Sequence, residues 1–230
     1  INRYWTTSTV SGEVSFDLPN VEPLNHSTVN IAHRDGAFQS SIVLGFQAFD
    51  RRNPKFPELT LLTQILGGGL SSRLNSKLRE EKGYTYGAFA VLDDNLFGSS
   101  VLIRTDVGTA VTKDAIHDIQ ETLERLCLDP ISEVELNLAK QYMIGSMIRG
   151  SESANQKSGL VQMCLLYGLP LSYFADLGAA LQQCTVESIK DVAKEIFLNK
   201  PYVLGICGDL KEINQYIEQF GFVTEASSIL

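Results

Sequence analysis

Three consecutive glycines at 67–69 interrupt a helical pattern, and this break constrains how the first half of the chain can fold. Apolar residues recur at helical spacing over 58–66, and helical character resumes over 70–81. Gly83 then provides an end signal for the second helix, and 84–91 reads as a strand. The sequence therefore predicts a helix, a glycine break, a second helix and a turn back into a strand.

This turn could bring two polar side chains close together. A helix end that returns through a glycine turn into a strand can bring Arg79 and Tyr86, seven residues apart, onto one patch. A guanidinium and a phenol could then donate to the same acceptor oxygen. A simpler interpretation is that Arg79 pairs with Glu80 or Glu81 while Tyr86 is a half-buried strand aromatic. Residue chemistry alone favours this simpler interpretation and leaves the other open.

The bulk composition limits the classes of function. A chain of 230 residues with 44% apolar and 20% charged residues is typical of one large globular domain or two small ones. Its net charge of −8 argues against a nucleic-acid or anionic-membrane surface, and no apolar run approaches the roughly 18 residues that cross a bilayer. Because the first residue is Ile1, we expect a part of a longer or processed polypeptide.

The four cysteines are widely spaced, form no C-x-x-C pair and lie among apolar residues. This pattern predicts buried free thiols rather than a disulfide framework, and favours a soluble protein in a reducing environment, although the compartment is not determined.

The order of the expected elements indicates the fold class. Expected strands occupy 29–34, 40–49, 84–91, 99–105 and 202–207. Further expected helices begin near Thr112 and Thr185 and cover 134–148, 155–167, 171–182 and 213–220. Asp35-Gly36 is a hairpin signal, so the first two strands are expected to pair directly.

Neither regular βαβ alternation nor an internal repeat is present. The order therefore predicts an α+β fold, with a mostly antiparallel sheet covered on one face by helices. We expect one domain over 28–222, a linker or edge segment at 1–27 and a tail at 223–230.

No self-contained catalytic site is evident. His26, His33 and His117 form no i, i+4 pair, and neither H-E-x-x-H nor H-x-x-E-H occurs, so we expect no metal site in this chain. No G-x-S-x-G nucleophile motif occurs, and the glycines at 67–69 match no phosphate-binding pattern. These glycines are either a simple helix break or a place where a peptide backbone can approach closely.

The wider pattern resembles the C-terminal, non-zinc half of pitrilysin-type zinc peptidases, the family of mitochondrial processing peptidase and insulin-degrading enzyme. The matching pieces, which cover roughly 28–222 in family order, are AFQSSIVLGF, LGGGLSSRLNSKLREEKGYTYGAFA, ISEVELNLAKQYMIGSMIRGSESANQKSGL, LYGLPLSYF, TVESIKDVAKEIF and PYVLGICGDL. The spacing L-R-x-x-x-G-x-x-Y after G-G-G-x-S-S-R-L is the most specific of these.

In that family two homologous halves close around a peptide, and the zinc half carries H-x-x-E-H. The resemblance implies that Arg79 and Tyr86 hold the scissile carbonyl region, and that Gly68, Gly69 and Ser72 contact the substrate. It also implies that zinc belongs to a partner half, either a preceding domain or a separate subunit, and that this chain alone is inactive.

Two other functions remain open. Core subunits of respiratory complexes share this family's fold and can lack proteolysis, so the chain could be structural. It could also be a peptide-binding or assembly module that pairs a sheet edge with extended peptide. The retained Arg79 and Tyr86 favour the peptidase, because a structural descendant has no chemical need for them.

Overall fold

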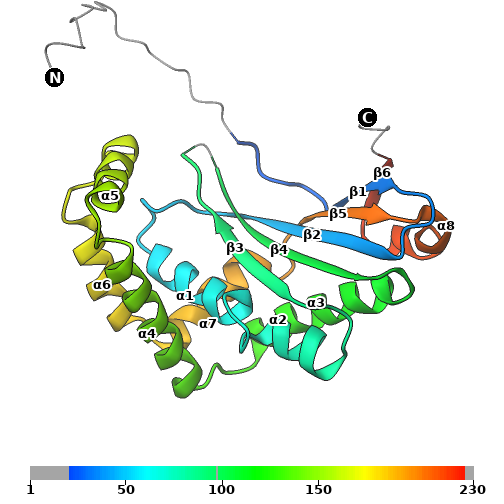
Figure 1. The fold of residues 1–230 in the computed structure, drawn as a ribbon, viewed down its shortest axis with the longest axis horizontal. Coiled ribbons are helices and arrows are strands. Elements are labelled where there is room, and N and C mark those ends of the chain that lie inside the picture. Colours follow the sequence, from blue (N-terminus) through cyan, green and yellow to red (C-terminus); the bar gives the residue numbers. More distant parts are fainter. Residues whose placement is uncertain (1–20, 97, 226–230) are drawn as a thin grey trace, which may run out of the picture.

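A single six-stranded sheet forms the centre of the molecule in the computed structural model, which describes residues 21–96 and 98–225 (Figure 1). The strands lie in the order β3-β4-β2-β5-β1-β6. Their bounds are Thr28–His33 (β1), Gln39–Ala48 (β2), Ala88–Asp93 (β3), Ser99–Gly108 (β4), Val203–Gly208 (β5) and Phe222–Glu225 (β6). Pairings between β3 and β4, β4 and β2, and β2 and β5 are antiparallel, whereas β1 pairs in parallel with β5 and β6.

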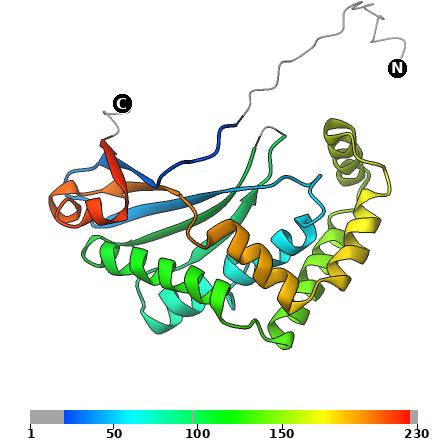
Figure 2. The same cartoon turned by 180° about the vertical axis from the view of Figure 1, so that it is seen from behind.

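Helices cover one face of this sheet and leave the other face open (Figure 1, Figure 2). The longer helices are Phe56–Gly67 (α1), Thr112–Leu128 (α3), Glu133–Arg149 (α4), Ala154–Tyr167 (α5), Tyr173–Gln183 (α6) and Val186–Phe197 (α7). The short ones are Arg73–Asn75 (α2), the π-helical Ser76–Glu81 (η1), the 3-10 turns Thr109–Val111 (η2) and Ile217–Phe220 (η3), and Leu210–Ile213 (α8). In the described part of the chain, none of these helices combines the length and apolarity needed to cross a bilayer.

The alternation of side chains along the strands produces this one-sided cover. On β2, Ile42, Leu44 and Phe46 are buried against the helices, while the residues between them point to the open face. Helix α1 supplies the opposing layer, with Leu59 and Leu62 completely buried. The predicted α+β fold, with helices on one face of a mostly antiparallel sheet, is confirmed.

Arg51 joins the sheet to the helices that stand at its side. Its guanidinium is paired with Asp94 and lies 5.4, 5.1 and 5.9 Å from the ring centroids of Phe56, Tyr167 and Tyr173. Cations over aromatic faces are attracted most strongly where water is excluded, and both members of the ion pair are largely buried. This cluster fixes the start of α1, the end of α5 and the start of α6 against one end of the sheet.

The predicted hairpin between the first two strands is wrong. The turn at Asp35-Gly36 exists, and Gly36 adopts a left-handed φ of +66°. Strand β5, however, lies between β1 and β2, where it pairs in parallel with β1 and antiparallel with β2. Its buried Leu204 and Ile206 complete the core at this position, which a local turn signal cannot anticipate.

The C-terminal end also differs from the expectation. The sequence predicts one helix over 213–220, whereas the chain forms the short α8 and the 3-10 turn η3. The predicted tail from residue 223 is wrong for 223–225, because β6 pairs in parallel with β1 through residue 225.

The expected N-terminal linker or edge segment lies largely outside the described residues, which begin at 21. Residues 21–27 form no strand. The side chain of Gln47 holds them, since its Oε1 accepts from Leu24 N (2.8 Å) and its Nε2 donates to Glu22 O (2.9 Å).

The cysteines are unpaired, and three of them are buried as predicted, whereas Cys207 is exposed. The Cys127 thiol donates to Ala193 O at 3.3 Å. Burial raises the pKa of Cys127 to about 11 and that of Cys184 to about 12. Cys207 lies on β5 and points to the open face of the sheet, so only this thiol departs from the expectation.

These raised pKa values predict alkaline destabilisation. The unfolded thiols lose their protons near pH 8.5, while the folded thiols keep them. The unfolded state then binds fewer protons, so the free energy of unfolding falls as the pH rises from about 9 toward 11 to 12. Urea unfolding at pH 7.5, 9 and 10 measures this slope. Cys127→Ala should reduce the slope and the exposed Cys207→Ala should not; equal slopes in both variants would contradict the assignment.

The close approach of α1 to β3 gives a second prediction. A Cβ on Gly67 would lie 2.2 Å from the backbone nitrogen of Ala90, so Gly67→Ala must displace α1 or β3. We expect a loss of about 2 kcal/mol or more in the free energy of unfolding, measured in urea. Gly69→Ala is the matched control, because the nearest atom to its Cβ would be Gln64 Nε2 at 3.8 Å. That variant should stay within about 0.5 kcal/mol, and similar losses in both would refute the packing argument.

Candidate functional site

The segment between α1 and β3 carries the residues singled out by the sequence. After Gly67 the chain makes a short loop, enters α2 and continues through η1 to residue 81. Arg73 anchors the segment to α4, because its Nε and Nη2 bind both carboxylate oxygens of Glu135 at 2.8 and 2.9 Å. Lys77 anchors it to α3 through Asp118 and Glu121, at 3.6 and 3.2 Å. The segment is therefore held from behind by the helical layer.

The second helix ends in a widened turn. Lys82 N donates to Lys77 O at 3.1 Å, a bond between residues five apart, and Tyr84 N donates to Leu78 O at 2.9 Å. Gly83 follows with a left-handed φ of +65°, as predicted for a glycine that ends a helix. π-helical turns of this kind are frequent at functional sites, and this one carries Arg79.

Asn75 locks the segment to the start of β3. Its completely buried Nδ2 donates to Ala88 O (2.7 Å) and Gly69 O (2.9 Å) and lies 3.2 Å from Ser72 Oγ. Its Oδ1 accepts from Ala88 N at 3.0 Å. One side chain therefore satisfies the outward backbone groups of Ala88 on the edge strand and also holds the glycine loop. Nothing in its sequence context, a single Asn within a predicted helix, distinguishes this role.

Arg79 and Tyr86 lie in contact, as their spacing suggested. The Arg79 Cζ is 5.2 Å from the centroid of the Tyr86 ring, within the range of a cation–π interaction. Tyr86 is 91% exposed and Arg79 is half-buried, so neither side chain is sealed in the core. The Arg79 Nε lies 3.4 Å from Glu80 Oε1, so the simpler pairing with Glu80 is also present.

The predicted position of Tyr86 on a strand is wrong. Strand β3 begins at Ala88, and Tyr86 lies in the loop before it. Thr85 closes this loop, because its hydroxyl donates to Gly87 O (2.9 Å) and accepts from Gly87 N (3.1 Å). The loop leaves the Tyr86 ring exposed to solvent beside Arg79.

The pair can act as a double donor. A guanidinium has five N–H groups in a fixed fork, and the exposed Glu80 takes only one side of it. The Tyr86 hydroxyl has no hydrogen-bond partner among the residues that the structure describes. Both groups are therefore available to an incoming carbonyl oxygen, and both would bind a negatively charged oxygen more strongly than a neutral one.

The other three residues predicted to contact a substrate are less exposed than Tyr86. Gly68 and Gly69 are half-buried, and the Gly69 carbonyl is already bound by Asn75. Ser72 is 5% exposed, and its hydroxyl is 3.2 Å from Asn75 Nδ2. The expectation that Ser72 touches a substrate with its side chain is not supported, because the hydroxyl faces the interior of the loop. Contacts through the backbone of Gly68 and Gly69 stay predictions.

A depression of about 380 Å³ lies behind this segment, between η1, α3 and the start of α4. Its charged groups are paired with one another, with Arg125 bound to Asp129 (3.2 Å), Lys77 to Glu81 (3.3 Å) and Arg73 to Glu135. This pairing leaves no cation free for a ligand, so the depression is a solvated seam between helices.

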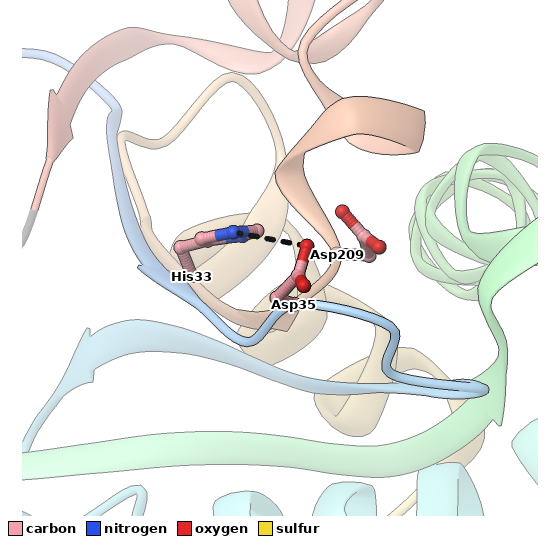
Figure 3. A group of neighbouring side chains, drawn as sticks. All are labelled: His33, Asp35 and Asp209. Atoms are coloured by element: carbon pink, nitrogen blue, oxygen red, sulfur yellow. Dashed lines mark ion pairs between the residues drawn. The ribbon is translucent and has the colours of Figure 1, made fainter.

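One group of potential metal ligands lies together where strands β1 and β5 end (Figure 3). His33, Asp35 and Asp209 meet there because β1 and β5 run in parallel and end at the same edge. Lys211 Nζ, however, lies 2.6 Å from Asp35 Oδ1, and the Asp209 oxygens accept from Lys211 N (3.0 Å) and Gly36 N (2.9 Å). An ammonium group already occupies the position of a cation, so the cluster fits a turn lock rather than catalytic zinc.

The role of Asn75 can be tested by removing its donors. In Asn75→Asp, three acceptors would face a buried carboxylate that cannot donate, so we expect a loss of about 3 kcal/mol in the free energy of unfolding. Hydrogen exchange of the amides at the start of β3 should become faster, because the strand loses the bond from Asn75 Nδ2 to Ala88 O although an acceptor for Ala88 N remains. The exposed Asn137→Asp on α4, which makes no side-chain hydrogen bond among the described residues, is the control. Equal stability of the two variants would exclude the proposed lock.

Comparison with known proteins assigns the chain to a family. The family model described as the peptidase M16 inactive domain matches residues 10–143. A protein named an uncharacterized zinc protease in Mycobacterium bovis is 32% identical over 195 residues, which cover 82% of this chain and 43% of that protein. A Bacillus subtilis protein, also named an uncharacterized zinc protease, is 30% identical over 147 residues, which cover 64% of this chain and 36% of that protein.

The fold agrees with this assignment. The crystal structure of a peptidase M16 inactive domain from Pseudomonas fluorescens matches with a TM-score of 0.75 and 25% identity, covering 84% of this chain and 46% of that chain. The chain thus spans less than half the length of these relatives. Because the family model covers more than half of the chain and the sequence and fold comparisons agree, the chain belongs to the peptidase M16 inactive-domain family.

Proposed function

We propose that this chain is the non-zinc half of a zinc metalloendopeptidase, in which Arg79 and Tyr86 hold the scissile carbonyl region of a peptide. The observation that carries this proposal is the contact between the two side chains, 5.2 Å from guanidinium carbon to ring centroid, at an accessible position. The stacked ring orients the guanidinium while its own hydroxyl stays unpaired among the described residues. This arrangement presents two donors to one point.

Two donors at this point would act mainly on the transition state. Attack on a peptide carbonyl moves negative charge onto its oxygen, and fixed donors stabilise that charge more than they stabilise the neutral substrate. Removing one such donor typically costs about 2.7–4 kcal/mol of transition-state stabilisation. The supports behind the pair, Asn75 and the Arg73–Glu135 contact, would keep both donors in place without reorganisation during the reaction.

The metal would come from another half. The described residues do not fit catalytic zinc, since the one candidate cluster contains the ammonium of Lys211. The M. bovis and B. subtilis relatives are named zinc proteases, and this chain matches less than half of each. We therefore place the zinc, with the chemistry it supplies, on a partner half that is either a preceding domain or a separate subunit. Gly68 and Gly69 would offer the bound peptide a backbone surface without side chains.

A structural or assembly role is the main competing proposal. In that case the contact between Arg79 and Tyr86 is only a surface cation–π pair, and the exposed edge strand β3 serves to bind another chain. The two proposals differ in one measurable respect, because only the peptidase needs the Tyr86 hydroxyl.

Tyr86→Phe and Arg79→Ala test the proposal in the protein assembled with its zinc-binding half. Tyr86→Phe keeps the ring under the guanidinium and removes only the hydroxyl. We expect each variant to lower kcat for peptide cleavage about 100- to 1,000-fold, with a smaller change in KM, because the lost interactions are strongest in the transition state. Steady-state kinetics with a fluorogenic peptide measures both constants.

Matched controls lie in the same segment. Tyr84 lies two residues before Tyr86 and its ring packs against the core, so Tyr84→Phe removes a hydroxyl at a neighbouring position. Lys82→Ala removes an exposed cation from the same segment. Both controls should stay within about twofold of the parent kcat, within the small effects typical of sites outside the chemistry. Unchanged kcat in both Tyr86→Phe and Arg79→Ala would reject the peptidase role of the pair and favour the structural alternative.

A further inference from the structure

The open face of the sheet continues directly from the proposed site. Side chains alternate along β3 and β4, so that Phe89 and Val91, with Leu102 and Arg104, point away from the helices. The ring of Phe89 reaches back to Gly87, where a Cβ would lie 3.0 Å from its Cζ. Gly87 is the residue after Tyr86, so Phe89 lies against the loop that carries the Arg79–Tyr86 pair.

Arg104 lies near the middle of this face. Its neighbours across the sheet are Phe89 on β3 and Val43 on β2. The side chain is exposed and makes no hydrogen bond, ion pair or ring contact with any residue in 21–96 or 98–225. Asp106, two residues along the same strand face, is bound by the Ser41 hydroxyl and does not pair with Arg104. Among the residues that the structure describes, the face therefore presents a single unpaired guanidinium between two apolar side chains.

The floor beside Arg104 is low enough to receive a peptide. Gly205 is the cross-strand neighbour of Val43 in the same row, and the nearest atom to a Cβ added to it would be Val43 O, at 3.7 Å. Gly45 lies in the next row, where only Leu102 leans over it, at 3.1 Å from an added Cβ. Two strands thus lack a side chain near the cation, at Gly45 in the next row and at Gly205 beyond Val43, while Phe89 and Val91, 50% and 45% exposed, form an apolar wall.

The distances suit one extended peptide. Phe89 follows Tyr86 by three residues, which span at most roughly 10 Å at about 3.4 Å per residue, and Arg104 lies beside Phe89 on the neighbouring strand. A peptide whose carbonyl lies at Arg79 and Tyr86 therefore reaches Arg104 within about three residues. Side chains of an extended peptide alternate, so a neighbouring apolar side chain would lie against Phe89 and Val91.

We infer that Arg104 is a carboxylate-recognition site for the bound peptide. The substrate class is a peptide with a carboxylate about three residues from the bond held at Arg79 and Tyr86, flanked by a large apolar side chain. The carboxylate is supplied either by an Asp or Glu side chain or by the peptide's own C-terminus. The guanidinium fork binds two carboxylate oxygens at once, which a neutral amide cannot reproduce. This inference rests on the proposed function, because the position of the peptide is set by Arg79 and Tyr86.

Equilibrium binding to the assembled protein, with its zinc removed by a chelator, tests this without turnover. Fluorescence anisotropy measures the affinity of peptides that carry Glu at a position two, three or four residues from the cleaved bond. Each is compared with a second peptide that has Gln at that position. A third peptide has Gln and a free C-terminus at the same distance, and a fourth has that terminus amidated. We expect the parent protein to bind one of the carboxylate peptides about three- to tenfold more tightly than its neutral counterpart. Tighter binding of the Glu peptide than of its Gln counterpart identifies an acidic side chain as the recognised carboxylate. Loss of affinity on amidation identifies the C-terminal carboxylate instead.

Variants of Arg104 decide whether this cation is responsible. Arg104→Gln should abolish the preference, and Arg104→Glu should reverse it in favour of a peptide with Lys at the same position. Arg34→Gln is the matched control, because Arg34 is another exposed arginine whose side chain has no partner among the described residues. That control should keep the parent preference. All variants change exposed side chains, and an unchanged urea midpoint confirms that they fold.

Two results would overturn the inference. The first is a parent preference that persists in Arg104→Gln or is absent from the parent protein. The second is an equal loss of affinity for all peptides together with weaker association of the two halves in sedimentation, which would assign Arg104 to the contact between them. Failure of the proposed function gives a different result, since unchanged kcat in the Arg79 and Tyr86 variants can coexist with Arg104-dependent binding.

Discussion

The close approach of α1 to the edge strand β3 is the constraint on which the rest of the site depends. Gly67 leaves no room for a Cβ against the backbone of Ala90, so the helix end and the strand touch directly. Asn75 then completes the contact by satisfying both outward backbone groups of Ala88. An edge strand with satisfied groups at its start is fixed in position, and the loop that carries Tyr86 is attached to that fixed point. The geometry of Arg79 and Tyr86 is thus set by buried packing behind them.

The two faces of the sheet have separate roles. Most strand residues that face the helices are apolar and buried, and their burial stabilises the fold. The opposite face combines exposed apolar side chains, two glycines and an unpaired arginine, which is unfavourable for stability and useful for binding. A face of this kind is typical of a surface that contacts another molecule.

Much of this arrangement could be predicted, and the errors have identifiable causes. The glycine break and the Gly83 turn follow from residues close in sequence, so local rules predict them. Local residue chemistry leaves the contact between Arg79 and Tyr86 open beside the pairing of Arg79 with Glu80, and the structure contains both contacts. Tyr86 was expected on a strand, because its neighbours have strand character, but hydrogen bonds of Thr85 close a loop there. Ser72 was expected to face a substrate and is instead buried against Asn75. The hairpin failed because β5, more than 150 residues away, inserts between β1 and β2.

The sequence by itself determined the family, the fold class and the seven-residue spacing of Arg79 and Tyr86, because periodicity, glycine positions and motif spacing are properties of neighbouring residues. Only the tertiary structure decided which strands are neighbours and that Asn75 joins Gly69 to both backbone groups of Ala88. It also decided that Arg104 lies between Phe89 and Val43 with no partner in the described part of the chain. These relations depend on strand order and register, which are set by the burial of the whole core. Local sequence patterns in single segments do not determine which strand order and register bury the whole core best.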